Sequence, residues 1–373
     1  MSRRTSSGLR VLDRLLGIPA LLPFALIPKR REPDWNTVRR IGVLKTAAIG
    51  DTLLLVTALT GIRRRFPSVK IILVTGENNA PAAALLSHLI DEQTVVSVRS
   101  PLSAIRTMRR LELDLLLECG PWPRYDALVT ALSGARYRVG FRVTGQARHF
   151  AFDRVVEHSS AIHQIENLNR LAASVGASDF GAARLPAPGG LSRDRLPPQP
   201  FVVMHAWSGG YMGQVKEWPS DRWVELARRL YERSRLHVVV SGGPGDVDRS
   251  RELAAAIVGA GVPATSIAGQ FSLLELADVL VASTMVVSVN TGVMHLSALV
   301  GAPTVSLEGP VAVHRWGPVG PRVHSVVTTL PNCGYLDLGF EYAGERLDCM
   351  DGVSVDAVVE AVEALSTSMR GVT

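Results

Sequence analysis

One aspartate stands where a reacting group would be expected. Asp51 follows the apolar run IGVLK (41–45) and the short loop TAAIG, and a helical stretch continues from it. A carboxylate at the carboxyl end of a buried strand can take a proton from an acceptor hydroxyl, as a general base does. An aspartate at this place can also be a plain N-cap of the helix. Asp51 is therefore our candidate catalytic residue, with a structural cap as the alternative.

Residues that suit a phosphate gather in the second half of the chain. The loop HAWSGGYMGQVKEWP contains small residues, which let backbone amides approach a ligand, and a lysine that could meet a diphosphate. Farther on, NTGVMH follows the apolar run MVVSV and opens a helix, whose free N–H groups and dipole attract anions. The alternatives are a solvated surface lysine and a structural histidine. The candidates are Ser208, Gly209, Lys216, Asn290, Thr291, Gly292 and His295.

The loop SGGPGDVD supplies a further candidate. It lacks the Gly-Lys-Ser/Thr ending of a Walker loop and does not complete G-x-G-x-x-G. Asp246 stands where a carboxylate could bind ribose hydroxyls. The alternative is a plain N-cap for the helix that starts at residue 247.

Arginines in the segment ARYRVGFRVTGQARH suggest an acidic or phosphorylated ligand. Arg138 and Arg142 are the candidates for capturing such an acceptor, with a solvated basic loop as the alternative. The net charge of +6 also favours anionic partners: phosphates, acidic glycans or a membrane surface. No DNA- or RNA-binding signature accompanies the charge, so we expect no nucleic-acid partner.

Three scattered cysteines, Cys119, Cys333 and Cys349, form no Cys-x-x-Cys pair. This pattern argues against a disulfide framework and against a structural zinc site. We therefore expect no bound metal and a reducing cytoplasm as the compartment.

Short apolar runs alternate with longer amphipathic ones along most of the 373 residues. The alternation predicts an α/β fold with mostly parallel sheets, and the length suits two domains. A Gly-, Ala- and Pro-rich linker separates the two halves. Loops at the carboxyl ends of the strands should line a cleft between the domains. We expect an extension (1–36), a Rossmann-like domain (37–180), the linker (181–199) and a second Rossmann-like domain (200–373), whose last helix could pack on the first domain.

The extension contains an apolar stretch with basic residues on both sides. Residues 15–28 read LLGIPALLPFALIP, which is shorter than the roughly 20 apolar residues of a spanning helix. The following PKRREP is no signal-peptide cleavage site. Residues 9–31 could lie on a membrane surface with arginines toward anionic headgroups, or pack on the protein as a strap. The first interpretation makes the protein peripheral on the inner face of the cytoplasmic membrane.

Three motifs, in order, resemble glycosyltransferase family 9, the heptosyltransferase family of lipopolysaccharide-core type. The first pattern is R/K-x-x-x-x-G-D followed by R-R-x-F-P, and the sequence reads LKTAAIGDTLLLVTALTGIRRRFP. The second, K-x-W-P-x-x-x-W-x-x-L, reads KEWPSDRWVEL. The third, S-N-D-T-G-P-M-H-L-A-A-A-L-G-x-P-T-V, reads SVNTGVMHLSALVGAPTV. The resemblance covers nearly the whole chain, from about residue 39 to residue 366.

The resemblance implies a GT-B fold and an inverting, metal-independent sugar transfer. Heptose is the expected sugar, moved from a nucleoside-diphosphate donor such as ADP-heptose to a hydroxyl of a glycolipid, lipopolysaccharide-core or other saccharide acceptor. The first domain would bind the acceptor and the second the nucleotide sugar, which is the only co-substrate expected. The resemblance assigns the base to Asp51, the diphosphate contact to Lys216, the ribose side to Asp246, and the anion-binding helix start to Thr291, Gly292 and His295.

The sequence departs from the family pattern beside the donor. Asn290 stands where the family has an aspartate, which removes one negative charge, and Val293 replaces a proline. The departure leaves the donor's identity open. Two alternatives remain: a sugar-nucleotide epimerase on the same fold, and a non-catalytic protein that binds a nucleotide sugar.

Overall fold

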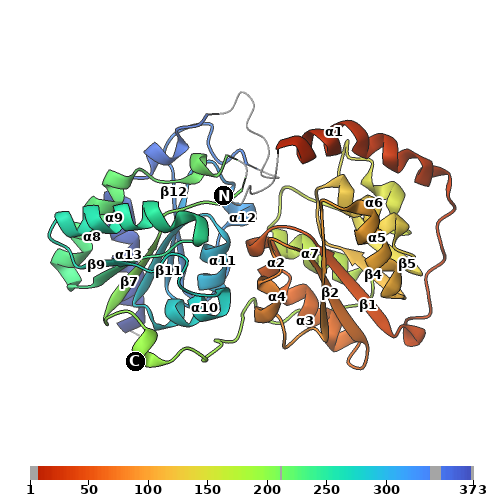
Figure 1. The fold of residues 1–373 in the computed structure, drawn as a ribbon, viewed down its shortest axis with the longest axis horizontal. Coiled ribbons are helices and arrows are strands. Elements are labelled where there is room, and N and C mark those ends of the chain that lie inside the picture. Colours follow the sequence, from red (N-terminus) through yellow and green to blue (C-terminus); the bar gives the residue numbers. More distant parts are fainter. Residues whose placement is uncertain (1–6, 211, 337–345, 371–373) are drawn as a thin grey trace. The chain divides into compact units, whose positions relative to one another are not determined.

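The chain forms two compact units in the computed structural model (Figure 1). The structure describes residues 7–210, 212–336 and 346–370. The first unit comprises Thr5–Ala182, and the second contains Ala183–Thr373. Each unit is built around one parallel sheet of six strands. The fold class is therefore α/β with two Rossmann-like units, as the alternating runs predict.

The first sheet has the order β3-β2-β1-β4-β5-β6. Its central strand β1 pairs in parallel with β2 on one side and β4 on the other. Both β1 and β4 are almost wholly buried, which explains their continuous apolar sequences, because helices cover both faces of a parallel sheet. The strands are β1 (Arg40–Lys45), β2 (Lys70–Gly76), β3 (Glu92–Val96), β4 (Leu115–Glu118), β5 (Tyr137–Arg142) and β6 (Arg154–Glu157).

The helices of the first unit follow the strands as crossovers. The single helix expected after β1 is divided in two, and α3 ends just before Phe66 and Pro67. Helix α3 packs on α7, and α5 packs on α6. The helices are α2 (Ile49–Leu53), α3 (Val56–Arg65), α4 (Ala82–Leu85), α5 (Pro101–Arg110), α6 (Arg124–Leu132) and α7 (Gln164–Ala173), with a short 3-10 helix η3 (Arg148–Ala151) after β5.

The N-terminal segment forms helix α1 (Ser7–Leu21) and the 3-10 helix η1 (Leu22–Leu26). Figure 1 shows α1 in red beside α6, and the two helices are in contact. The strap interpretation is therefore confirmed for the face of α1 that meets the first unit. Among the residues that the structure describes, no helix combines the length and apolar character needed to cross a bilayer.

The second sheet has the order β12-β11-β10-β7-β8-β9. Trp218 and Trp223 pack edge to face in the core, with ring centroids 5.2 Å apart. The last helix, α13, packs on α8, β11 and β12 of its own unit. The strands are β7 (Phe201–His205), β8 (His237–Val240), β9 (Ala264–Ser266), β10 (Met285–Val289), β11 (Thr304–Glu308) and β12 (Val323–Val327). The helices are α8 (Ser220–Ser234), α9 (Val247–Gly259), α10 (Leu273–Ala282), α11 (Gly292–Leu299), α12 (Val313–Trp316) and α13 (Val355–Arg370).

Both sheets share one topology. Counted within its own unit, each has the strand order 3-2-1-4-5-6 of a doubly wound sheet. The winding direction reverses between β1 and β4 in the first unit and between β7 and β10 in the second. Ligands of such sheets bind outside the carboxyl ends of the strands at this switch point. The topology therefore selects the loops after β1, β4, β7 and β10.

The cysteines differ from expectation. Cys333 and Cys349 form a disulfide, with Cα atoms 5.8 Å apart, whereas Cys119 is a buried free thiol. The sequence pattern argues against a disulfide framework, and it did not predict this single pair. The two are 16 residues apart in sequence, and no Cys-x-x-Cys spacing marks them as a pair.

Candidate functional site

Asp51 lies at the switch point of the first sheet, paired with a lysine. It occupies the first turn of α2, whose N-cap is Ala48. The N-cap alternative is therefore wrong. The Lys45 Nζ atom lies 2.9 Å from Asp51 Oδ2. The lysine side chain is 3% exposed and the aspartate side chain 28%, so the ion pair fixes a carboxylate that still reaches solvent.

Asn79 holds this loop from the side of β2. Its fully buried side chain donates from Nδ2 to Lys45 O and to Thr52 Oγ1, each at 2.7 Å. Its Oδ1 accepts from Gly76 N at 2.9 Å. One amide thus joins the ends of β1 and β2 to helix α2. Asn79 is not among the residues predicted from the sequence, although an asparagine just after a buried strand is a recognisable signal.

Asp126 holds the same loop from the side of α6. The Thr46 hydroxyl donates to the Asp126 carboxylate, with both oxygens at 2.8 Å. Burial raises the pKa of Asp126 to about 7, and the nearby Glu118 charge adds to the rise. Asp126 is not among the residues predicted from the sequence, although an aspartate within a helical, mostly apolar stretch is a recognisable signal.

The loop after β4 is built on a fully buried ion pair between Glu118 and Arg148. Glu118 Oε1 also accepts from Gly120 N at 2.8 Å, and the guanidinium of Arg148 donates to Pro123 O and Gly120 O. Burial raises the pKa of Glu118, and the charge of Arg148 opposes the rise. Arg148 comes from the basic segment that could have been a solvated loop, yet it is wholly interior.

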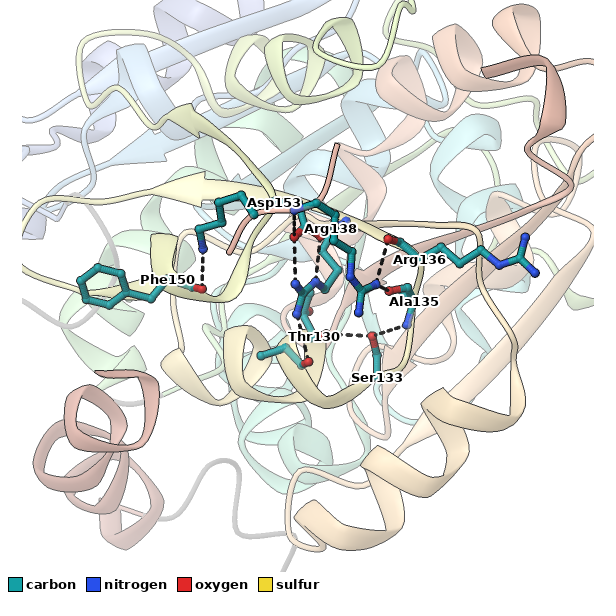
Figure 2. A network of polar contacts seen from close by, with 10 residues as sticks. Thr130, Ser133, Ala135, Arg136, Arg138, Phe150 and Asp153 are labelled. Carbon is teal, nitrogen blue, oxygen red and sulfur yellow. Dashed lines mark hydrogen bonds and ion pairs between the residues drawn. The ribbon is translucent and has the colours of Figure 1, made fainter. Parts of the chain in front are cut away.

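Of the two arginines that are candidates for binding the sugar acceptor, Arg138 is buried and pairs with Asp153. It lies on β5, and its side chain is 7% exposed. Figure 2 shows its guanidinium facing Asp153, to which Nε and one terminal nitrogen donate at 2.9 Å each. Although burial opposes the effect, these hydrogen bonds hold the pKa of Asp153 below its ordinary value. Arg138 is therefore a structural residue, a correction to its expected acceptor role.

Arg142 differs from Arg138. Its side chain is 47% exposed, and its guanidinium lies 3.3 Å from Oε1 of Glu157, whose side chain is 70% exposed. Such an exposed pair is weak and can open at little cost in free energy. Of the two arginines, Arg142 is the one that presents its charge to solvent.

In the second unit, the loop after β7 contacts Arg249 of α9, a residue that was not predicted from the sequence. The guanidinium carbon of Arg249 lies 3.8 Å from the centroid of the Trp207 ring. The same guanidinium pairs with Glu217, which accepts from Ser208 N at 2.9 Å. These contacts fix the backbone beside the exposed Gly209.

The loop after β10 begins α11 as the sequence predicts. Thr291 is the N-cap, and its Oγ1 accepts from Val293 N at 3.2 Å and Met294 N at 3.4 Å. Both hydrogen bonds are long. They direct the amides of Val293 and Met294, in the first turn of α11, toward the Thr291 hydroxyl. Gly292 is half-buried, whereas His295 is buried. The helix start is therefore confirmed, with its histidine inside the fold.

Asn290 contacts a buried glutamate at the end of β11. Its Nδ2 donates to Glu308 Oε2 at 2.9 Å, to Oε1 at 3.2 Å and to Trp316 O at 3.0 Å. Burial raises the pKa of Glu308 to about 7, against the hydrogen bonds from Ser306 and Asn290 and the charge of Lys216. An aspartate at position 290 would place a second carboxylate against Glu308. This contact gives a physical reason for the asparagine.

Asp246 closes a turn. Its Oδ2 accepts from Gly243 N at 2.9 Å, and the residue is 8% exposed. It ends the 3-10 helix Pro244–Asp246, directly before α9. Asp246 thus occupies the N-cap position of α9, as the alternative predicts, while its carboxylate closes the turn that precedes the helix.

Within the described ranges, no three His, Cys, Asp or Glu side chains are grouped so that they could hold a metal ion. The polar groups at both switch points are carboxylates, amides and cations held in pairs. Such an arrangement suits proton transfer and the binding of an anion.

Comparison with known proteins gives the same fold and a family. The sequence profile of glycosyltransferase family 9 (heptosyltransferase) matches residues 123–334. Lipopolysaccharide heptosyltransferase 1 of Pseudomonas aeruginosa is 30% identical over 300 residues, which cover 73% of this chain and 79% of the relative. The structure of Escherichia coli ADP-heptose lipopolysaccharide heptosyltransferase II has a TM-score of 0.71 at 19% identity, over 89% of this chain and 99% of that chain.

A second solved structure is the E. coli heptosyltransferase WaaC with ADP. Its TM-score is 0.66 at 21% identity, over 87% of this chain and 99% of that chain. Both structural likenesses establish the GT-B fold that the three motifs imply. The profile match and the sequence identity carry the assignment further: this chain belongs to glycosyltransferase family 9, the heptosyltransferase family, and is a glycosyltransferase.

Proposed function

We propose that the enzyme transfers a heptose from an ADP-heptose-like donor to a hydroxyl of a lipopolysaccharide-core saccharide or related glycolipid. Its relative from P. aeruginosa is a lipopolysaccharide heptosyltransferase, and a structural relative is solved with ADP. The observation that carries the proposal is the Lys45–Asp51 pair at the switch point of the first sheet.

In the proposed reaction, Asp51 is the general base. The acceptor hydroxyl oxygen attacks the anomeric carbon of the donor sugar, and the bond from that carbon to the diphosphate oxygen breaks. The hydroxyl proton passes to Asp51, and the nucleoside diphosphate leaves with the electron pair. Attack opposite the leaving group inverts the anomeric configuration. The 28% exposure of the Asp51 side chain and its fixed orientation support this role.

The second unit stabilises the leaving diphosphate in this proposal. Lys216 supplies positive charge, and the start of α11 at Thr291 and Gly292 supplies amides and a dipole. Ser208 and Gly209 let the backbone approach the donor, and the buried His295 and Asn290 shape the loop. Asp246 holds the turn on the ribose side. The proposed transfer needs no metal, since these groups meet the negative charge.

The proposed division of the chain follows the expected boundaries. Residues 37–180 bind the acceptor, with Arg142 for its acidic groups, and residues 200–373 bind the nucleotide sugar. Residues 181–199 connect them, and residues 1–36 are an accessory extension. We place the reaction in the cytoplasm. Alkylation of the thiols in lysates prepared under acid would test this placement, because a reducing compartment is expected to open the Cys333–Cys349 disulfide.

A donor panel tests the proposed function. The purified enzyme is given ADP-heptose, UDP-glucose or GDP-mannose with a heptose-free lipopolysaccharide acceptor, and both nucleotide release and the modified acceptor are measured. Inverting transfer of heptose from the ADP donor is expected. An isomerised sugar nucleotide without transfer would support an epimerase instead. Donor binding without turnover would support a non-catalytic binding protein, the alternative that the substitution at Asn290 raises.

A further inference from the structure

The N-terminal segment has one face that is anchored to the first unit. Asp13, Gly17 and Leu21 are spaced four residues apart and share this face of α1. Asp13 accepts a hydrogen bond from Tyr125 N at 2.9 Å, and one of its oxygens lies 3.3 Å from Arg124. Both side chains of the ion pair are less than a tenth exposed.

The anchored face is also closely packed. A Cβ atom on Gly17 would lie 2.6 Å from Cδ of Arg124, so only glycine allows this approach. Leu21 is fully buried in a small apolar cluster with Ala127, Ala151 and Phe152. These contacts fix the rotation of α1 about its axis, and they determine which side chains point outward.

The outward side chains are apolar. Val11, Leu12, Leu15 and Leu16 recur at helical spacing on α1, with 55%, 53%, 65% and 56% of their surfaces exposed. The stripe continues through η1, where Leu26 is 88% exposed. A helix on a protein surface ordinarily turns polar residues toward water, and an exposed apolar surface of this kind marks an interaction site. We call this stripe the outer apolar face: Val11, Leu12, Leu15, Leu16, Leu22, Leu26 and Ile27.

Positive charge accompanies the outer apolar face. Residues 7–31 contain five basic residues and one acidic residue, and that acid, Asp13, is neutralised by Arg124. The basic residues are Arg10, Arg14, Lys29, Arg30 and Arg31. Of these, Lys29, Arg30 and Arg31 are exposed where the segment leaves η1.

This basic end is tied to the first unit through backbone carbonyls. Lys29 Nζ donates to Phe150 O at 2.8 Å, and the Arg30 guanidinium donates to Ala135 O and Arg136 O. Figure 2 shows these acceptors, and the side chain of Arg136 extends away from the network. That side chain is 82% exposed and lies 3.2 Å from Asp114 Oδ1, in an ion pair that is weak because the arginine is exposed. An anchored apolar stripe thus ends at a cluster of cations held at the surface.

We propose that the outer apolar face lies on an anionic phospholipid bilayer. The leucines enter the boundary between headgroups and acyl chains, while Lys29, Arg30, Arg31 and Arg136 meet phosphate groups. Charge complementarity selects this partner over a second copy of the chain, because two such segments would bring like charges together. The inference extends the proposed function by placing the enzyme beside a glycolipid acceptor, but the binding itself does not depend on the reaction.

Vesicle co-sedimentation of the full chain tests the proposal. Wild-type protein is expected to bind phosphatidylcholine–phosphatidylglycerol vesicles, more weakly in high salt and more weakly to pure phosphatidylcholine vesicles. The double variant Leu15→Gln/Leu16→Gln is expected to lower the partition coefficient by about tenfold or more, because two large apolar side chains are lost.

Matched leucines elsewhere provide the control. Leu102 and Leu347 are 68% and 53% exposed, close to the 65% and 56% of Leu15 and Leu16. The variant Leu102→Gln/Leu347→Gln should bind vesicles like the wild type. Thermal unfolding of both variants should match the wild type, since all four side chains are exposed.

Three results would overturn the proposal. The first is absence of wild-type binding to the anionic vesicles, and the second is equal loss of binding in both double variants. The third is a wild-type protein that does not bind vesicles but forms a dimer, which the Leu15→Gln/Leu16→Gln variant no longer forms. Transfer to a detergent-dispersed acceptor is measured in parallel. If transfer fails while vesicle binding follows the expected pattern, the proposed function fails and the membrane inference stands.

Discussion

The amide nitrogen of Asn290 donates to both carboxylate oxygens of Glu308, at 3.2 Å and 2.9 Å. The two residues come from the ends of adjacent strands, β10 and β11. Lys216, from the loop after β7, contributes charge to the same glutamate. Asn290, which departs from the family motif, therefore lies beside an acid. When Glu308 ionises, it carries the negative charge that an aspartate at position 290 would have carried.

Asn290→Asp is expected to destabilise the protein. The new carboxylate would face the buried Glu308, and Trp316 O would lose the N–H donor that Asn290 supplies. Together these changes should lower the free energy of unfolding by about 1–3 kcal/mol. Adding Glu308→Gln should recover part of the loss, because the glutamine amide can donate to the aspartate. Urea unfolding of the two single variants and the double variant measures this coupling. Additive effects, with no recovery, would contradict the pairing.

Glu308 should make stability fall as the pH rises. Its pKa is raised from 4.5 to about 7 in the folded protein by burial. Between these values the folded protein keeps a proton that the unfolded chain has released, so the free energy of unfolding decreases with increasing pH. Glu308→Gln should flatten this decrease over the same interval. An unchanged slope in urea titrations at several pH values would show that Glu308 does not hold its proton in the fold.

Asn79→Ala should loosen the loop that positions Asp51. Three hydrogen bonds are lost, and Gly76 N, Lys45 O and Thr52 Oγ1 lose a buried partner. We expect a loss of about 2–4 kcal/mol in unfolding free energy, from roughly 1 kcal/mol per bond and the cost of unpaired buried groups. Sugar transfer at a temperature where the variant is folded should also fall.

The exposed Asn36 provides a control for this variant. Asn36→Ala should leave both the unfolding free energy and sugar transfer close to wild type. If Asn79→Ala behaves like Asn36→Ala in both measurements, the amide does not hold the loop.

Lys216→Ala should weaken binding of ADP. Loss of a cation beside a diphosphate costs roughly 1.5–3 kcal/mol, or about tenfold to a hundredfold in Kd. Isothermal titration calorimetry with ADP measures the change, and Lys70→Ala, a surface lysine paired with Glu92 in the first unit, should leave the Kd unchanged. Equal affinities for wild type and Lys216→Ala would remove this lysine from the donor site.

The sequence predicted most of what depends on local pattern. Buried parallel strands have continuous apolar sequences, so β1, β7 and β10 and the start of α11 at Thr291 could be recognised. The ordered motifs gave the family. Side-chain partners across the fold could not be predicted in this way. Arg138 and Arg142 are four residues apart on one strand, yet one is buried against Asp153 and the other is exposed.

The other residues that were not predicted from the sequence also act through partners that are distant along the chain. Glu308, Asn79 and Asp126 act through contacts with residues 18, 34 and 80 positions away in sequence. The pairing of Cys349 with Cys333 is likewise a contact between residues 16 positions apart, which no local pattern marks. For the N-terminal segment, the strap interpretation describes the packed face of α1, and the membrane interpretation, which is our proposal, concerns the outer apolar face.

Replacement of Asp51 by asparagine tests the central claim most directly. The carboxamide of Asp51→Asn keeps the shape of the side chain and an oxygen that can accept from Lys45, but it cannot take the acceptor proton. Circular dichroism and the Kd for ADP should match the wild type, while heptose transfer should fall by about a hundredfold to ten-thousandfold. A folded Asp51→Asn variant that binds ADP and transfers heptose at nearly the wild-type rate would contradict the account.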